Sequence, residues 1–123
     1  MGLLRSFGSA LRGMGTVFKE EHNFRIQIFA GIFIVLLSFA LSLSIIEKSI
    51  LVLLIIIVLS LEMLNSILER FVDILKPRVH TYVKDAKDIA AGAVLVSSLG
   101  ALVVGIIIFY PHIYSFVVGV TGK

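Results

Sequence analysis

The side chains of this 123-residue chain that could carry out chemistry are concentrated between residues 61 and 73. A helix with 3.6 residues per turn would place five polar residues of this stretch within an arc of about 100°, and they are Glu62, Asn65, Ser66, Glu69 and Asp73. The carboxylates would extend over roughly 16 Å of the helix axis, at 1.5 Å per residue. The opposite face is apolar, so the spacing predicts a polar ladder on a helix that is otherwise suited to lipid.

The composition indicates a membrane protein. Hydrophobic residues make up 59% of the chain, charged residues 15%, and the mean hydropathy is +1.08. A soluble domain would carry about a quarter charged residues. The chain has no cysteine, which excludes disulfides and thiol chemistry.

The elements that must position the ladder follow from the apolar stretches. A membrane helix needs about 20 apolar residues, and 26–46, 49–75 and 87–110 are long enough. Pro111 is expected to end the last helix and to leave 111–123 as a tail on the outer side. Residues 1–22 alternate apolar and basic residues at helical spacing, which predicts an amphipathic helix at the membrane interface. We therefore expect one all-α membrane domain over residues 1–123.

Small residues in the last span predict assembly. They fall at every fourth position, at Ala93, Ser97, Ala101 and Gly105. Such stripes let helix backbones approach closely in lipid. Since three helices alone enclose little, close packing suggests a homo-oligomeric bundle.

The distribution of Lys and Arg predicts the orientation. Four of them precede the first span, and five cluster over 70–87, where the second span ends and the third begins, whereas the first connector and the C-terminus hold one each. Because basic residues gather on the cytoplasmic side, we expect a cytoplasmic N-terminus and an external C-terminus. The basic residues follow this topology and lack accompanying base-stacking aromatics, so no nucleic-acid partner is expected.

The depth of Glu62 in the membrane marks it as functional. If the second span starts near Ser49, Glu62 lies about 20 Å along it, in the inner third of a hydrocarbon layer of about 30 Å. A carboxylate near the bilayer centre costs roughly 2.5–3.5 kcal/mol, and the off-centre Glu62 should cost less. No requirement of folding demands a carboxylate at this position, so Glu62 is a candidate for function. The alternative is that the polar groups of the ladder form structural hydrogen bonds between helices.

Other charged residues are expected at the same boundary, with Glu21 before the first span and Lys87 and Asp88 at the start of the third. Carboxylates at this density repel one another unless a cation joins them, and Glu oxygens with water and phosphate suit Mg²⁺. Lys87 suits a phosphate, and a remaining carboxylate could accept a proton from a hydroxyl. The set suggests phosphoryl transfer to a lipid alcohol, without a GxxxxGK[ST] loop for the nucleotide.

Two other classes use the same features. An ion or proton conductor could use the polar ladder, but it needs polar residues through the whole membrane, and 35–43 and 50–59 offer nothing beyond scattered serines. A structural anchor or accessory subunit would leave Glu62 and Glu69 without a purpose.

The motif Glu62-x-x-Asn65-Ser66-x-x-Glu69-x-x-x-Asp73, followed by Ala86-Lys87-Asp88, resembles the small prokaryotic diacylglycerol kinase family. The segment Glu21-His22-Asn23-Phe24-Arg25 is similar to that family too, and the resemblance runs from about Leu3 to Tyr114. The sequence departs from the family at Ile67-Leu68, where members often have a small residue followed by Ile or Val.

This resemblance implies an ATP- and Mg²⁺-dependent kinase of the bacterial inner membrane, assembled as a homotrimer with active sites at subunit contacts on the cytoplasmic side. Glu62 would be the general base, and Glu21 and Glu69 would hold the metal. The nucleotide would contact Asn65, Asp73, His80, Lys87, Asp88 and Arg5, and the lipid alcohol would contact Asn23, Arg25 and Glu62. Family members phosphorylate either diacylglycerol or undecaprenol, and the 44–47 connector and the third helix look more like the Gram-positive members, many of which are undecaprenol kinases.

Overall fold

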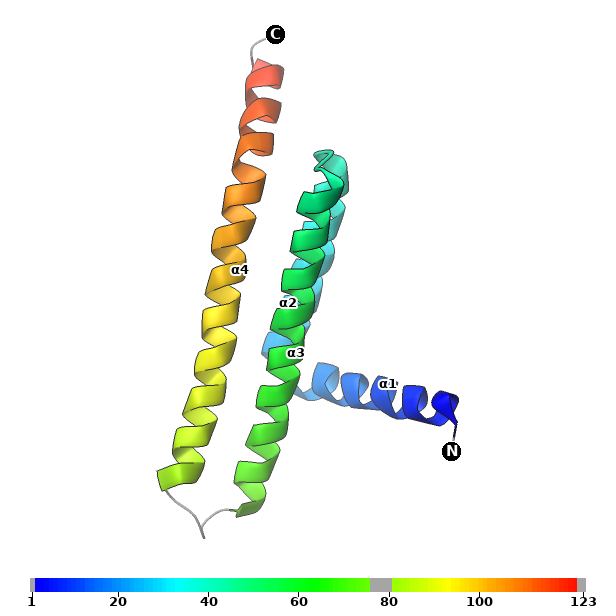
Figure 1. Cartoon of the computed structure of the whole chain (residues 1–123), viewed down its shortest axis with the longest axis vertical. Coiled ribbons are helices and arrows are strands. Elements are labelled where there is room, and N and C mark those ends of the chain that lie inside the picture. The colour runs from blue at the N-terminus through cyan, green and yellow to red at the C-terminus, as the bar shows by residue number, and fades with distance from the viewer. Residues whose placement is uncertain (1, 76–80, 122–123) are drawn as a thin grey trace.

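The structure, a computed structural model, describes residues 2–75 and 81–121. It contains helices α1 (Leu3–Glu20), α2 (His22–Ala40), α3 (Ile45–Leu75) and α4 (Thr81–Thr121). Figure 1 shows α2, α3 and α4 running alongside one another, while α1 projects sideways from the bundle. The last three helices are long and apolar enough to cross a membrane. The predicted all-α membrane architecture is therefore confirmed.

The bundle helices differ in length, and this difference exposes one end of the bundle. α2 has 19 residues, α3 has 31 and α4 has 41, which correspond to about 28, 46 and 61 Å at 1.5 Å per residue. Both α3 and α4 continue past the level at which α1 leaves the bundle (Figure 1). We call this end of the bundle the α1 end, and the opposite end, where α2 turns into α3, the turn end. The polar part of α3 lies at the α1 end.

The turn between α2 and α3 is tighter than the sequence analysis predicts. α2 ends at Ala40, and Ser42 adopts a positive φ of 56°, with Leu43 N–H donating to the Ser38 carbonyl oxygen at 3.0 Å. Ser44 then caps α3, because Glu47 N–H donates to Ser44 Oγ at 3.1 Å and Ser44 N–H donates to Glu47 Oε1 at 2.9 Å. This reciprocal pair is a capping box. It starts the helix at Ile45, so the predicted bounds of 26–46 and 49–75 are wrong at this turn.

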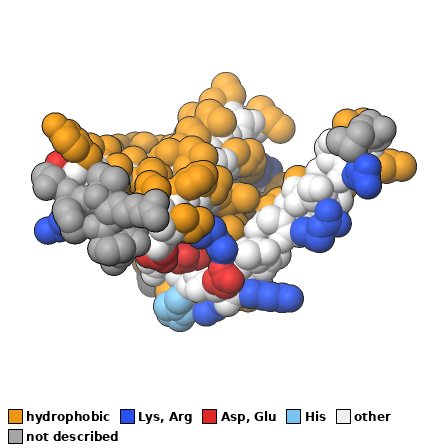
Figure 2. Space-filling view, turned by 90° about the horizontal axis from the view of Figure 1, so that it is seen from below, with side chains coloured by type: hydrophobic (Ala, Val, Ile, Leu, Met, Phe, Trp, Pro, Cys, Tyr) orange, Lys and Arg blue, Asp and Glu red, His pale blue; other side chains and the backbone are white. Residues whose placement is uncertain are grey.

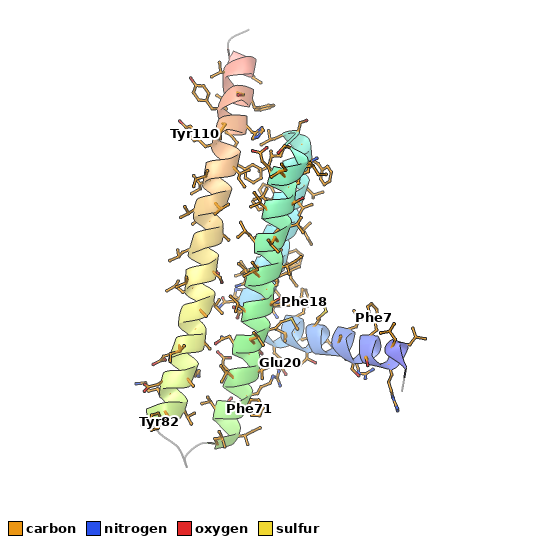
Figure 3. The ribbon with its side chains drawn as sticks, viewed as in Figure 1. Phe7, Phe18, Glu20, Phe71, Tyr82 and Tyr110 are labelled. Carbon is orange, nitrogen blue, oxygen red and sulfur yellow. The ribbon has the colours of Figure 1, made fainter. Side chains whose placement is uncertain are left out.

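The prediction that Pro111 ends the last helix is also wrong. α4 passes through Pro111 and continues to Thr121, so the described part of the expected tail is helical. Proline removes one backbone donor. Unwinding the helix at this point would break several backbone hydrogen bonds, at a greater cost. The stacked rings of Tyr110 and Tyr114, with centroids 6.4 Å apart, flank this site, and Figure 3 shows Tyr110 near the turn end.

α3 packs against both α2 and α4. Gly31 allows the close approach of α2, because a Cβ at this position would lie 3.1 Å from Ile55 Cγ2. By contrast, a Cβ at Gly105 of the predicted small-residue stripe would meet nothing within 4 Å. The stripe therefore does not produce a close helix contact at Gly105 within one chain, and the homo-oligomer stays a prediction.

The C-terminal end of α1 is bound to α2 and α3, and these contacts fix the direction in which α1 leaves the bundle. The Arg25 guanidinium of α2 donates to the carbonyl oxygens of Phe18 and Lys19, at 2.7 and 2.8 Å. Arg70 of α3 forms an ion pair with Glu20, which Figure 3 shows at the base of α1 next to α3. The predicted N-terminal helix thus exists over Leu3–Glu20, and the extended backbone of Glu21 separates it from α2. Its position at the membrane interface stays a prediction.

Candidate phosphoryl-transfer site

The polar ladder of α3 is partly buried among the helices. Glu62 is 3% exposed and Ser66 is 2% exposed. Among the described residues, Glu62 is the one charged side chain that is buried. Asn65 and Glu69 are half-buried, and Asp73, near the end of α3, is exposed. The ladder therefore runs from the interior of the bundle to its surface at the α1 end.

Glu62 has a neighbour that the sequence analysis did not single out. Gln27 of α2 donates from Nε2 to Glu62 Oε2 at 3.3 Å. A single amide in an otherwise apolar span has no periodic signal. The one sequence feature that could have identified Gln27 is its polar side chain, which follows Arg25 in a stretch that otherwise suits lipid.

Glu21 contacts α3 one turn beyond Glu62, and Glu69 lies about one turn further toward the α1 end. Ser66 Oγ donates to Glu21 Oε1 at 3.3 Å, and Asn65 Nδ2 lies 3.4 Å from Glu69 Oε1. Glu69 interacts electrostatically with Glu21, with Lys87 and with Glu62. The structure thus brings residues of α3 and α4 and the residue between α1 and α2 to one place. Of the charged groups expected at this boundary, Glu21, Glu62, Glu69 and Lys87 therefore lie near one another.

The donor set fits a hard cation that is shared with a phosphate ligand. No group of three or more His, Cys, Asp or Glu side chains in residues 2–75 and 81–121 is arranged to hold a metal by itself. However, Mg²⁺ is often held by one or two carboxylates and completed by water and substrate phosphates. Glu21 and Glu69 provide two carboxylates. Beside them, Asn65 Oδ1 is buried without a hydrogen-bond partner among the described residues, which leaves one further oxygen available.

Within one chain, only some of the residues predicted to bind the nucleotide lie close together. Lys87 is half-buried near Glu69, whereas Asp88 is exposed on α4. Arg5 lies on α1, 16 residues before Glu21, which is about 24 Å along a helix. One chain therefore does not bring Arg5 to the ladder. His80 lies outside the described residues.

The two residues expected to contact the lipid alcohol, apart from Glu62, have other surroundings. Arg25 is occupied by the carbonyl oxygens at the end of α1, so in this chain its contacts are structural. Asn23 is exposed on the first turn of α2. Neither has a hydrogen bond to Glu62 in the described part of the chain.

The site lies where apolar and charged surfaces meet. Figure 2, seen from the α1 end, shows acidic side chains next to basic ones where α1 joins the bundle, and apolar side chains over the bundle itself. A lipid could present a polar head here while its chain stays in the membrane. A phosphorylated ligand could approach from water at the same place. The arrangement can therefore bring together one substrate from lipid and one from solution.

Comparisons with known proteins agree with this chemistry. The profile of the family described as prokaryotic diacylglycerol kinase matches residues 8–109. An undecaprenol kinase of Bacillus subtilis is 38% identical over 109 residues, which cover 89% of this chain and 89% of that protein. A diacylglycerol kinase of Synechocystis is 38% identical over 117 residues, covering 94% of this chain and 67% of its own. A diacylglycerol kinase of Haemophilus influenzae is 30% identical over 109 residues, covering 88% and 92%.

The matched range contains the whole polar ladder, Glu21 and Lys87. The fold, the converging carboxylates and the relatives thus lead to one conclusion: this chain belongs to the prokaryotic diacylglycerol kinase family and is an integral membrane lipid phosphotransferase.

Proposed function

We propose that this protein transfers the γ-phosphate of Mg²⁺-bound ATP to the hydroxyl of a membrane lipid alcohol, at an α1 end that faces the cytoplasm. The observation that carries the proposal is the buried carboxylate of Glu62, 3% exposed, next to the Glu21, Glu69 and Lys87 group. A buried carboxylate without a cationic partner is costly, and a role in proton transfer accounts for it.

The chain's residues take distinct parts in this reaction. As the lipid oxygen bonds to the γ-phosphorus and the bond to ADP breaks, Glu62 accepts the hydroxyl proton. Glu21 and Glu69 would hold Mg²⁺, which neutralises charge on the ATP phosphates. Lys87 adds a positive charge near the same phosphates. Positioning and charge neutralisation account for most of the catalysis in such a transfer.

We infer a homotrimer for the same reaction. Arg5 and Asn23 stay away from Glu62 within one chain, and a neighbouring copy could supply such groups to the site. Many apolar side chains of α2, α3 and α4 are exposed, so one chain leaves room for neighbouring copies as well as lipid. The basic residues at the α1 end support its cytoplasmic orientation.

Undecaprenol is our preferred substrate, with diacylglycerol as the competing one. The Bacillus subtilis protein named undecaprenol kinase aligns over 89% of both chains at 38% identity. The relatives named diacylglycerol kinase either cover less of their own length or are less identical. The products would be undecaprenyl phosphate and phosphatidic acid, respectively.

The test is the transfer of radiolabelled γ-phosphate from ATP to lipid by purified protein in mixed micelles. Undecaprenol and diacylglycerol are offered in separate reactions, each with and without Mg²⁺. We expect Mg²⁺-dependent phosphorylation, faster with undecaprenol. Faster transfer to diacylglycerol would overturn the substrate choice, and no transfer to either lipid by folded protein would overturn the function.

A further inference from the structure

The amide of Gln27 lies against the buried carboxylate that the proposed reaction uses as its base. Its Nε2 donates to Glu62 Oε2 at 3.3 Å, and this is the one hydrogen bond that Glu62 makes among the described residues. The two residues come from different helices, α2 and α3, so their contact also depends on the packing of these helices. Gly31, one turn further along α2, lets the backbones approach closely at Ile55.

The contact gives the two oxygens of the Glu62 carboxylate different roles. With Oε2 held by Gln27, Oε1 is left to accept a proton from a substrate hydroxyl. A carboxylate that rotates freely spends little time in one geometry, and a displacement of about 1 Å can cost a hundredfold in rate. An amide donor also carries no charge, so it orients Glu62 without the strong stabilisation of the ionised form that a Lys or Arg would provide.

The surroundings of Gln27 leave it few other partners. It lines a cavity of about 470 Å³ between α2, α3 and α4, whose remaining walls are apolar apart from Ser98. Its Oε1 is buried and has no hydrogen-bond partner among the described residues. An amide kept only for stability would be expected to have both ends paired, because a buried unpaired oxygen is costly. Here the amide is paired only toward Glu62.

We infer that Gln27 is a positioning residue for phosphoryl transfer, which holds Glu62 in the orientation that accepts the lipid hydroxyl proton. This inference rests on the proposed function. It assigns to α2 a direct part in orienting the base, in addition to its role as a membrane span.

The first experiment replaces the amide by a side chain of similar length without a donor. Gln27→Met should lower kcat at least about tenfold, as expected for loss of a hydrogen bond to a charged group, while KM for ATP stays within about twofold of wild type. Ser98→Ala, in the same cavity on α4, is the matched control and should keep wild-type kcat. Thermal midpoints of both variants are measured to verify that they fold.

The second experiment asks whether Gln27 acts through Glu62. Glu62→Asp withdraws the carboxylate by one methylene and should already break the contact. Gln27→Met should then reduce kcat less than about twofold when added to Glu62→Asp, because the effects of two residues that act through one contact are not additive. If Gln27 had a merely structural role, the two substitutions would act independently, and the kcat of the double variant would fall by the product of the two single effects.

The outcomes separate this inference from the proposed function. An active wild type with an equally active, folded Gln27→Met would overturn the positioning role and leave the kinase intact. Multiplied losses in the double variant would overturn it too. An inactive, folded wild type would overturn the proposed function itself.

Discussion

α3 carries glutamates near both of its ends, and their surroundings are opposite. At the turn end, Glu47 accepts from Ser44 N–H at 2.9 Å and meets His112 Nε2 of α4 at 3.1 Å. At the α1 end, Glu62 is buried with a neutral amide at 3.3 Å, and Glu69 lies near two further carboxylates, those of Glu21 and Glu62.

This difference separates a carboxylate that stabilises the fold from carboxylates for which we propose a part in the reaction. Glu47 completes a capping box and ties the start of α3 to α4, so its charge is used within the protein. The carboxylates at the α1 end are placed next to like charges and to amide oxygens without partners. We propose that Lys87, a cation and a phosphorylated ligand together balance this charge.

The largest expected effect is at the buried end of the ladder. Glu62→Gln keeps the shape and the contact with Gln27 but cannot accept the proton. General base catalysis contributes about a hundredfold to ten-thousandfold, so lipid phosphorylation should fall at least about a hundredfold. ATP binding, measured by equilibrium dialysis, should change little. A rate within tenfold of wild type would show that Glu62 is not the base.

The next effect concerns the metal. Glu69→Gln removes one of the two carboxylates that we propose for Mg²⁺, so the Mg²⁺ concentration for half-maximal rate should rise by about tenfold. Asp85→Asn changes an exposed carboxylate on α4 and is the control. It should leave the Mg²⁺ concentration for half-maximal rate unchanged. An unchanged titration for Glu69→Gln would remove it from the metal site.

A smaller effect is expected at Lys87. Lys87→Met keeps the length of the side chain but removes a charge next to Glu69, and KM for ATP should rise by roughly threefold to tenfold. Lys84→Met, one turn earlier on α4 and exposed, should leave KM unchanged. Equal effects of the two variants would indicate a general loss of positive charge and contradict a specific phosphate contact.

The smallest effect is expected at the turn end. His112→Phe removes the contact with Glu47, whose side chain is 29% exposed. An exposed pair of this kind contributes little to stability, so the thermal midpoint should fall by a few degrees at most, while kcat stays near that of wild type. A tenfold loss of kcat with an unchanged midpoint would contradict the division between the two ends.

The spans and the ladder could be predicted because both depend on local pattern. Long apolar runs specify membrane helices, and the spacing of Glu62 and Glu69 places them on one helix face. The bounds at the turn were missed although the signal was present, since Ser44 and Glu47 have the spacing of a capping box. Pro111 was misread because a proline was taken to end the helix, whereas α4 continues through it with the loss of one backbone donor.

Contacts between distant residues could not be predicted from the pattern. Gln27 and Glu62 are 35 residues apart, and Glu47 and His112 are 65 apart. Their meeting depends on how the helices pack and on their relative register, which no single span encodes. For the same reason, the role expected for Arg25 toward the lipid could not be distinguished from its contacts with the end of α1.

The most direct test of the central claim compares two variants of the same helix. The rate of γ-phosphate transfer to lipid is measured for Glu47→Gln and Glu62→Gln in the same micelles, with wild type alongside. We expect Glu47→Gln to retain most of the wild-type rate and Glu62→Gln to lose at least about a hundredfold. Equal rates for the two variants would contradict the assignment of the chemistry to the α1 end.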